Sequence, residues 1–246
     1  MTRNHNDQAD DLFTTRAREW TPASMGHIAT VLYAPRSNNS EFSKRCASVL
    51  SDDERTRARR FLTKKDAAHF IERRAFRRYC GGLALKSCGA SSSLSEILFE
   101  ETEKGRPFLP GLPDFRFSFS ACKSGYLGAW SSTHGIGVDI EDQSRKLEAA
   151  DLAQRFFSQA EAKAIEGATA EDEHFNRFYK FWCLKEAALK SIGEGLPFGL
   201  DAFEFTLTPA LTIINAPPGT GGREKFDARL IEQADHCAAL VIHTVN

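Results

Sequence analysis

Apolar and polar positions alternate along several short segments of this chain, and this pattern predicts β-strands. The clearest case is the segment FRFSFS, in which every second residue is aromatic, as expected for a strand with one buried face. The pattern predicts strands at residues 27–33, 115–120, 126–131, 135–140, 200–206 and 238–245.

Between these strands, the chain carries sequence signals for helices. Ser51 with Glu54, and Ser158 with Glu161, have the spacing of a capping box, which marks the start of a helix. We therefore expect helices to begin at these positions, and the sequence predicts further helix at 67–80, 151–165 and 173–192. The pair Gly81-Gly82 is expected to end or interrupt the first long helix.

The order of strand, helices and strands occurs twice, with a join near residues 133–135. This order suggests an internal duplication of structure without visible repetition of sequence. We expect an α+β fold with a flexible extension at 1–24, an N-terminal lobe at 25–134 and a C-terminal lobe at 135–246.

The composition is that of an ordinary globular protein, with 41% apolar and 26% charged residues. With 32 basic and 33 acidic residues, nothing global predicts a nucleic-acid partner. No apolar run has the length of a membrane span. The six cysteines form no C-x-x-C pair and no zinc-ligand spacing with histidine. We therefore predict a cytoplasmic protein with reduced thiols.

The sign of charge is distributed unevenly. Ten arginines and lysines lie between Arg55 and Arg78, whereas acidic residues concentrate in the second half. This asymmetry suits a phosphate-rich ligand held between the two halves, with a metal on one side. Two amphipathic helical regions with solvated faces would give the same composition.

Two carboxylates follow a glycine in the segment GVDIED. Asp139 and Glu141 are two residues apart on the predicted strand, so their side chains point to the same face. Like charges at this spacing repel unless a cation lies between them, and oxygen ligands favour Mg²⁺ or Mn²⁺. A solvated strand edge is the alternative interpretation.

A second candidate cluster lies on the last long helix. Trp182, Glu186 and Lys190 are four residues apart and therefore share one stripe. Glu186 would point toward the metal, and Lys190 would lie one turn further on, near phosphate. A surface Glu–Lys ion pair within the helix has the same spacing and contributes little stability.

Taken together, the two patterns are more specific. The D-x-E after a glycine, followed later by W-x-x-K-E-A-x-x-K, resembles the 4′-phosphopantetheinyl transferase superfamily, in particular its larger, pseudo-two-fold type. The resemblance implies two similar lobes, each a small sheet packed with helices, and an active site in the cleft between them. It also implies that Asp139, Glu141 and Glu186 bind Mg²⁺, that Lys190 meets phosphate, and that Lys185 is a further ligand-binding residue.

The first half carries further matches to this family. Arg74 and Arg78 lie four apart on the first long helix, where the resemblance implies contacts with coenzyme A phosphates, although a solvated basic face would look the same. Gly105-Arg106-Pro107 resembles the family's G-K-P turn, and 117–120 (FSFS) resembles the strand that leads into a Ser-His pair. Ser120 is present, but Ala121 stands where the family has histidine.

The family resemblance implies a holo-[carrier protein] synthase. A serine of an apo acyl or peptidyl carrier protein would attack the β-phosphate of coenzyme A, releasing 3′,5′-ADP, with Glu186 as candidate general base and Lys190 assisting. The carrier would belong to fatty-acid or secondary-metabolite biosynthesis, and the enzyme would be a monomer. A metal-dependent phosphohydrolase and a non-catalytic module that binds coenzyme A or a carrier remain rival interpretations.

Overall fold

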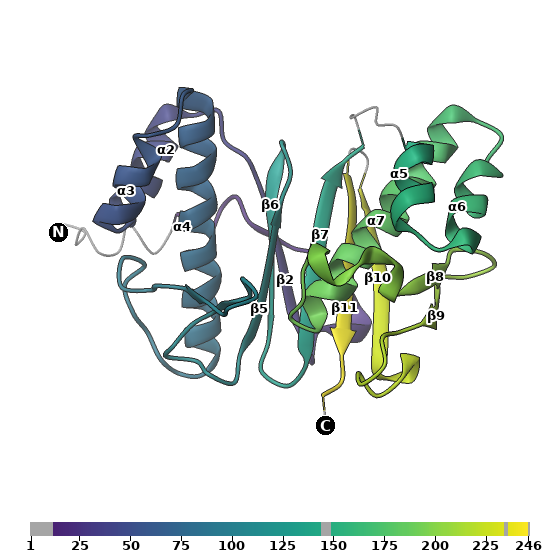
Figure 1. Cartoon of the computed structure of the whole chain (residues 1–246). Coiled ribbons are helices and arrows are strands. Elements are labelled where there is room, and N and C mark those ends of the chain that lie inside the picture. Colours follow the sequence, from purple (N-terminus) through teal and green to yellow (C-terminus); the bar gives the residue numbers. More distant parts are fainter. Residues whose placement is uncertain (1–11, 144–148, 234–235, 246) are drawn as a thin grey trace, which may run out of the picture.

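The computed structural model describes residues 12–143, 149–233 and 236–245. In the described part of the N-terminal half, helices α2 and α3 precede the long helix α4, and the strands β2, β5 and β6 lie on the other side of α4 (Figure 1). These elements are β1 (Arg18–Glu19), β2 (Thr30–Pro35), α2 (Ser40–Ser48), α3 (Asp52–Ala58), α4 (Lys64–Ser87), β3 (Glu100–Glu101), β4 (Pro107–Phe108), β5 (Arg116–Ala121) and β6 (Gly125–Ser131), with a 3₁₀ turn at Ala23–Met25.

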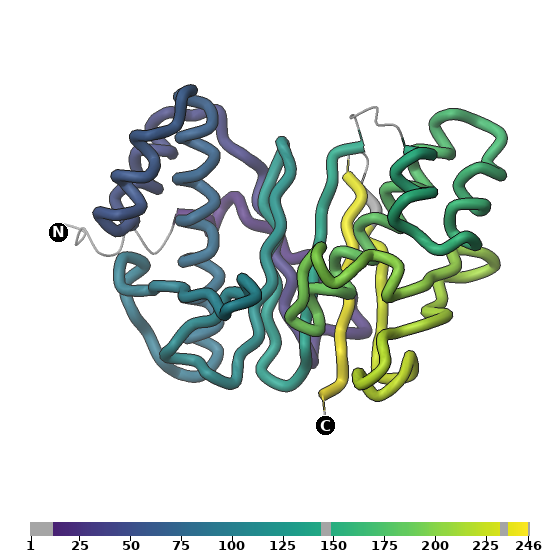
Figure 2. The backbone as a smooth tube through the Cα atoms, in the orientation of Figure 1, coloured from purple at the N-terminus to yellow at the C-terminus, as the bar shows by residue number. Residues whose placement is uncertain are grey.

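The C-terminal half begins with β7 and is built around the long helix α7. Its elements are β7 (Gly135–Asp142), α5 (Ala149–Phe156), α6 (Gln159–Glu166), α7 (Glu171–Ser191), β8 (Glu204–Thr206), β9 (Thr212–Asn215), β10 (Phe226–Gln233) and β11 (His236–His243), with 3₁₀ turns at Leu196–Phe198, Leu200–Ala202 and Arg223–Lys225. Figure 2 shows the two halves side by side.

The two main sheets share one topology. The first has the strand order β1-β2-β6-β5 and the second the order β10-β11-β7, and all pairs are antiparallel. In each half the first long strand leads into the helices, and the last strand then pairs beside it. Thus β2-β6-β5 corresponds to β7-β11-β10, and α4 corresponds to α7. The predicted α+β fold with two similar lobes is therefore confirmed.

The core consists of three apolar clusters. One lies between α4 and the first sheet and includes Phe76 and Phe117, and another lies between α5–α7 and the second sheet and includes Phe178. The third cluster joins Val31 of β2 to Val138 of β7 and fills the space between the two sheets. Because strand residues alternate between faces, each sheet can contribute to an outer cluster and to the central one.

Several predicted boundaries were wrong for identifiable reasons. Gly81 and Gly82 do not end a helix, because α4 continues to Ser87. A Cβ added to Gly81 would lie 2.7 Å from Ile97, so these glycines permit close packing of the 94–99 loop. The single helix predicted at 151–165 is two helices, because the Ser158 capping box starts a new one.

The sequence missed α2, whose N-cap is Asn39, the strands β9 and β10, and the two-residue strands β1, β3 and β4. The segment 1–24 was predicted to be flexible, and its residues 1–11 lie outside the described residues. Leu12 and Phe13 are buried in the cluster beneath α4, so these two residues pack against the N-terminal half. The remaining domain boundaries stay a prediction. Among the described helices, none is both long enough and apolar enough to cross a bilayer.

Candidate active site

The outer face of β7 changes from glycine to carboxylate along its length. Gly135, Gly137, Asp139 and Glu141 share this face, while Val138 and Ile140 point into the cluster between the sheets. A Cβ on Gly137 would lie 1.8 Å from the carbonyl oxygen of Ala187. The glycines therefore let the backbone of α7 lie directly on β7, next to the two carboxylates. Asp139 and Glu141 point to the same face of the strand, as their spacing in the sequence predicts.

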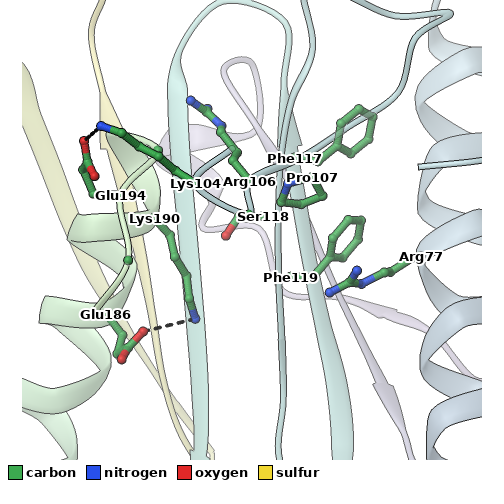
Figure 3. A pocket seen from close by; sticks show the side chains of 13 residues that line it. Arg77, Lys104, Arg106, Pro107, Phe117, Ser118, Phe119, Glu186, Lys190 and Glu194 are labelled. Carbon is green, nitrogen blue, oxygen red and sulfur yellow. Dashed lines mark hydrogen bonds and ion pairs between the residues drawn. The ribbon is translucent and has the colours of Figure 1, made fainter. Parts of the chain in front are cut away.

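Helix α7 brings Glu186 and Lys190 to this acidic face. The Lys190 ammonium lies 2.8 Å from Asp139 Oδ1 and 3.7 Å from Glu186 Oε2, and it donates to the carbonyl oxygen of Val138 at 3.3 Å. Figure 3 shows Glu186 and Lys190 projecting from the same side of the cavity. The i,i+4 pair is thus joined to β7 and is not an isolated surface ion pair.

These groups have shifted pKa values because they are buried close to one another. Burial, the Asp139 carboxylate and other neighbouring acids raise the pKa of Glu141 to about 7, although Lys190 acts in the opposite direction. Burial likewise raises the pKa of Glu186. Burial opposes the charged form of Lys190, but the carboxylates of Asp139 and Glu186 outweigh it and raise its pKa. The site therefore has more negative charge than its single ammonium neutralises.

The donor set suits a hard divalent cation. Asp139 is 4% exposed, and its Oδ2 is buried without a hydrogen-bond partner, while Oδ1 accepts from Lys190 and Ser120. The three carboxylates supply oxygen ligands, which Mg²⁺ prefers. Asp139, Glu141 and Glu186 would hold such a cation, which would neutralise their excess negative charge.

A cavity of about 200 Å³ opens beside this cluster, and both halves of the chain line it. Its walls include three cationic side chains from the N-terminal half and the polar face of α7 from the other half (Figure 3). The lining residues are Arg77, Lys104, Gly105, Arg106, Pro107, Phe117, Ser118, Phe119, Glu186, Lys190, Gly193, Glu194 and Gly195. The arrangement provides positive charge opposite a carboxylate cluster.

A tight turn presents Arg106 to the cavity. The N–H of Arg106 donates to the Thr102 hydroxyl, and the turn is completed by Gly105 with φ +79°. One guanidinium nitrogen, Nη2, is buried without a hydrogen-bond partner, and burial lowers the pKa of Arg106. An ion pair between Lys104 and Glu194 ties this turn to the end of α7. The structure thus places Arg106 at the cavity, and its role in binding coenzyme A stays a prediction.

Arg77 lines the same cavity and was missed by sequence reasoning. Its guanidinium lies 5.2 Å from the ring centre of Phe119 and 3.6 Å from Glu101. Burial and the neighbouring charges of Arg74 and Arg73 lower its pKa to about 10. Its buried Nε has no hydrogen-bond partner. The sequence has four arginines between positions 73 and 78, and it does not show which of them faces the cavity. The direction of each side chain depends on how α4 packs against the rest of the fold.

Ser120 contacts a carboxylate and does not line the cavity. The aromatic residues of the FSFS segment face the core beneath α4, while its serines face β7. Ser118 Oγ accepts from the N–H of Val138 at 3.0 Å, and Ser120 Oγ donates to Asp139 Oδ1 at 2.7 Å. Ser120 therefore orients Asp139. Ala121 ends β5 and packs against the core, so no imidazole stands at that point.

The structure contradicts the prediction that Arg78 contacts coenzyme A phosphate. Arg78 is 2% exposed and donates to the carbonyl oxygens of Leu94, Ser95 and Ile97. Its Nη2 also lies 2.6 Å from Glu54 Oε2. These partners commit its guanidinium to holding the loop after α4, since a buried cation needs all of its available acceptors.

Arg74, one turn before Arg78, is more accessible. Its Nε lies 3.6 Å from Glu54 Oε1, and its side chain is 21% exposed. With Arg77 it lines a neighbouring cavity of about 280 Å³ that does not include Lys190 or Glu186. The role of Arg74 in binding coenzyme A therefore stays a prediction. The cavity that Arg74 lines is not the one that Glu186 and Lys190 line.

The structure also contradicts the prediction that Lys185 binds the ligand. Its side chain is fully buried, 2.7 Å from Glu161 Oε2, and it donates to the carbonyl oxygens of Leu200 and Phe203. Burial lowers its pKa, although Glu161 acts in the opposite direction. On a helix, adjacent residues point about 100° apart, so Lys185 faces the interior while Glu186 faces β7.

Comparison with known proteins identifies close relatives of this chain. The model of the 4′-phosphopantetheinyl transferase superfamily matches residues 135–241, which include the β7 carboxylates and α7. The 4′-phosphopantetheinyl transferase Sfp of Bacillus subtilis (strain 168) is 32% identical over 72% of this chain and 75% of its own length. A phosphopantetheinyl transferase of Thraustochytrium is 31% identical over 80% of this chain and 72% of its own length, and the transferase HetI of Nostoc is 29% identical over 66% and 67%.

Proposed function

Because this chain belongs to the 4′-phosphopantetheinyl transferase superfamily, we propose that it transfers the phosphopantetheinyl arm of coenzyme A to a serine of an apo carrier protein. One observation carries the proposal. The Asp139–Lys190–Glu186 cluster borders a cavity whose opposite wall is cationic, which suits a substrate rich in phosphate.

We propose that Asp139, Glu141 and Glu186 hold Mg²⁺, or Mn²⁺ in its place. The unpartnered Oδ2 of Asp139 and the raised pKa values of the two glutamates support this assignment, because a divalent cation would neutralise them. When bound, the cation supplies charge neutralisation at the pyrophosphate. Ser120 keeps Asp139 in its orientation through the hydrogen bond to Oδ1.

The cationic residues of the cavity would hold the phosphates. Arg106 and Arg77 each have a buried guanidinium nitrogen without a partner, and planar guanidinium groups suit phosphate oxygens. Lys190 reaches the same cavity and would turn from the carboxylates toward phosphate. Arg77 thus supplies a cation in a chain that has alanine at position 121, where the family has histidine.

Glu186 is our candidate for the general base. It lines the cavity, and its carboxylate can accept the proton of the attacking serine hydroxyl while the 3′,5′-ADP group leaves. The pKa of Glu186 is raised toward neutral pH, which favours proton transfer to its carboxylate. We further propose that the enzyme is a cytoplasmic monomer, because one chain supplies both walls of the cavity and all six cysteines are free. Size-exclusion chromatography with light scattering would test the oligomeric state.

The reaction is tested by intact-protein mass spectrometry of apo acyl and peptidyl carrier proteins incubated with this chain, coenzyme A and Mg²⁺. We expect one phosphopantetheinyl adduct on a carrier serine, an equal amount of 3′,5′-ADP, and loss of both with EDTA. Coenzyme A binding without an adduct on any carrier would support the rival binding module. Release of phosphopantetheine without a carrier would instead indicate a phosphohydrolase.

A further inference from the structure

A second cluster of metal-binding side chains lies at the other face of β7. Cys122 comes from the turn between β5 and β6, Asp142 ends β7, and His236 begins β11. Among the residues that the structure describes, these are the only three His, Cys, Asp or Glu side chains whose ligand atoms all lie within 4.8 Å of one another. Their wide separation in sequence explains why no spacing motif revealed them.

The cluster faces away from the Mg²⁺ carboxylates. Asp142 follows Glu141 directly, so the pleat of β7 turns the two side chains to opposite faces. Glu141 faces α7, whereas Asp142 meets the turn of the N-terminal half, where its Oδ2 accepts from the N–H of Lys123 at 2.6 Å. This hydrogen bond fixes the orientation of the carboxylate, as outer partners commonly do for metal ligands.

Ser124 adds an oxygen at the centre of the cluster. Its hydroxyl lies 3.2 Å from Cys122 Sγ and 2.5 Å from His236 Nε2, and it donates to Asp142 Oδ1. Rings of Tyr33 and Trp20 pack against His236, with centres 5.5 and 6.4 Å away, so aromatic side chains cover one side. The site thus offers three ligands in a partly enclosed position between the two sheets, with the Ser124 hydroxyl hydrogen-bonded among them.

The donor chemistry distinguishes this cluster from the carboxylate site. A thiolate, an imidazole and a carboxylate are characteristic ligands of Zn²⁺, whereas Mg²⁺ avoids sulfur. Metal–ligand bonds of about 2.0–2.3 Å in a tetrahedron separate the ligand atoms by roughly 3.3–3.8 Å. Asp142 Oδ1 and His236 Nε2 are already 3.6 Å apart, so a small inward movement of Cys122 would complete the set.

We propose that Cys122, Asp142 and His236 form a Zn²⁺ site with a water molecule as the fourth ligand, the Ser124 hydroxyl turning away from the centre that it occupies in this structure. On binding, the Cys122 thiol would lose its proton to solvent and form the bond to the metal. Because Cys122 belongs to the first half and the other two ligands to the second sheet, Zn²⁺ would tie the two halves together. The site is independent of coenzyme A and of the carrier.

Cobalt spectroscopy tests the site directly. The tag-free full-length chain is titrated with Co²⁺, a spectroscopic substitute for Zn²⁺, under reducing conditions and with excess Mg²⁺ to occupy the carboxylates. We expect a thiolate-to-cobalt charge-transfer band at one equivalent, which Zn²⁺ removes. Cys122→Ser should abolish the band, and His236→Ala should weaken Co²⁺ binding at least tenfold. Cys88→Ser is the matched control, because Cys88 is exposed and is not part of the cluster, and it should leave the band unchanged.

Thermal unfolding provides a second measurement. Zn²⁺ should raise the Tm of the wild-type and Cys88→Ser proteins but not of the Cys122→Ser protein. The absence of a charge-transfer band in the wild type, or a full band in Cys122→Ser, would overturn the proposal. If Cys122→Ser does not fold, an unchanged Co²⁺ affinity in folded His236→Ala would overturn it equally. Neither measurement uses transferase activity, so the outcome is separate from that of the proposed function.

Discussion

The long helix of each half of the molecule contains a buried ion pair of the same kind. In the first half, Arg78 of α4 pairs with Glu54, the capping-box glutamate of α3, and holds carbonyl oxygens of the loop that follows α4. In the second half, Lys185 of α7 pairs with Glu161, the capping-box glutamate of α6, and holds carbonyl oxygens that follow α7. Each cation thus joins a helix start to a later loop.

The halves differ in the side chains that lie next to this buried ion pair on the long helix. Counting from the buried cation, Glu186 and Lys190 of α7 correspond to Tyr79 and Leu83 of α4, which pack into the apolar core. Both halves therefore contain the buried pair, and the second half has a charged cluster at the positions where the first has core side chains. This teaches that a charged residue on such a helix is structural or functional according to the face it occupies.

The largest effect should follow Glu186→Gln. If the charged face of α7 serves transfer and not folding, the substitution should reduce carrier modification by at least roughly 10²–10³-fold, because it removes a carboxylate from the cation site and from the base position. The Tm should change little. Glu173→Gln, at the exposed start of the same helix, is the control and should keep full activity. A fully active Glu186→Gln protein would remove Glu186 from both roles.

The second effect concerns stability and tests the buried ion pair between Lys185 and Glu161. Lys185→Met should lower the free energy of unfolding by about 3–5 kcal/mol, because it leaves Glu161 buried without its cation. Urea unfolding measures this loss. Lys163→Met, on the exposed face of α6, should cost far less. Equal losses for the two variants would show that the buried pair does not support the fold.

A smaller loss is expected in the first half. Arg78→Met should lower the free energy of unfolding by roughly 1.5–3 kcal/mol, because Glu54 is partly exposed and keeps Arg74 beside it. Arg74→Met should change stability by no more than about 0.5 kcal/mol and should instead weaken coenzyme A binding, measured by calorimetry. Destabilisation by Arg74→Met as large as that by Arg78→Met would break the distinction between the two arginines.

The smallest effect is the dependence of stability on pH that Glu141 of the second half contributes. The pKa of Glu141 is raised to about 7 in the folded chain, so its protonated form favours folding. That contribution is fully present below its unfolded pKa, near 4.5, and is lost as the pH rises to about 7. Without Mg²⁺, the Tm of the wild type should therefore fall across this window relative to Glu141→Gln. Added Mg²⁺ should reduce the difference, and identical pH profiles would contradict the assignment.

The sequence predicted the parts of the site that depend on local geometry. The period of a strand places Asp139 and Glu141 on one face, and the period of a helix places Glu186 and Lys190 on one stripe. The two capping boxes were also predicted, since they depend on residues three apart. The same periodicity could not separate Arg74 from Arg78, which share one stripe. It puts Lys185 and Glu186 on different faces of α7 but could not tell which face is buried. Their roles depend on which element covers each face of the helix.

The sequence by itself determined the elements that bear the chemistry and the family to which the chain belongs. Only the tertiary structure decided which cations are buried partners and which face the cavity, and only it brought Cys122, Asp142 and His236 together. The physical reason is that backbone periodicity acts over a few residues. Burial, and therefore the partner of a charge, is set by contacts between segments far apart in the chain.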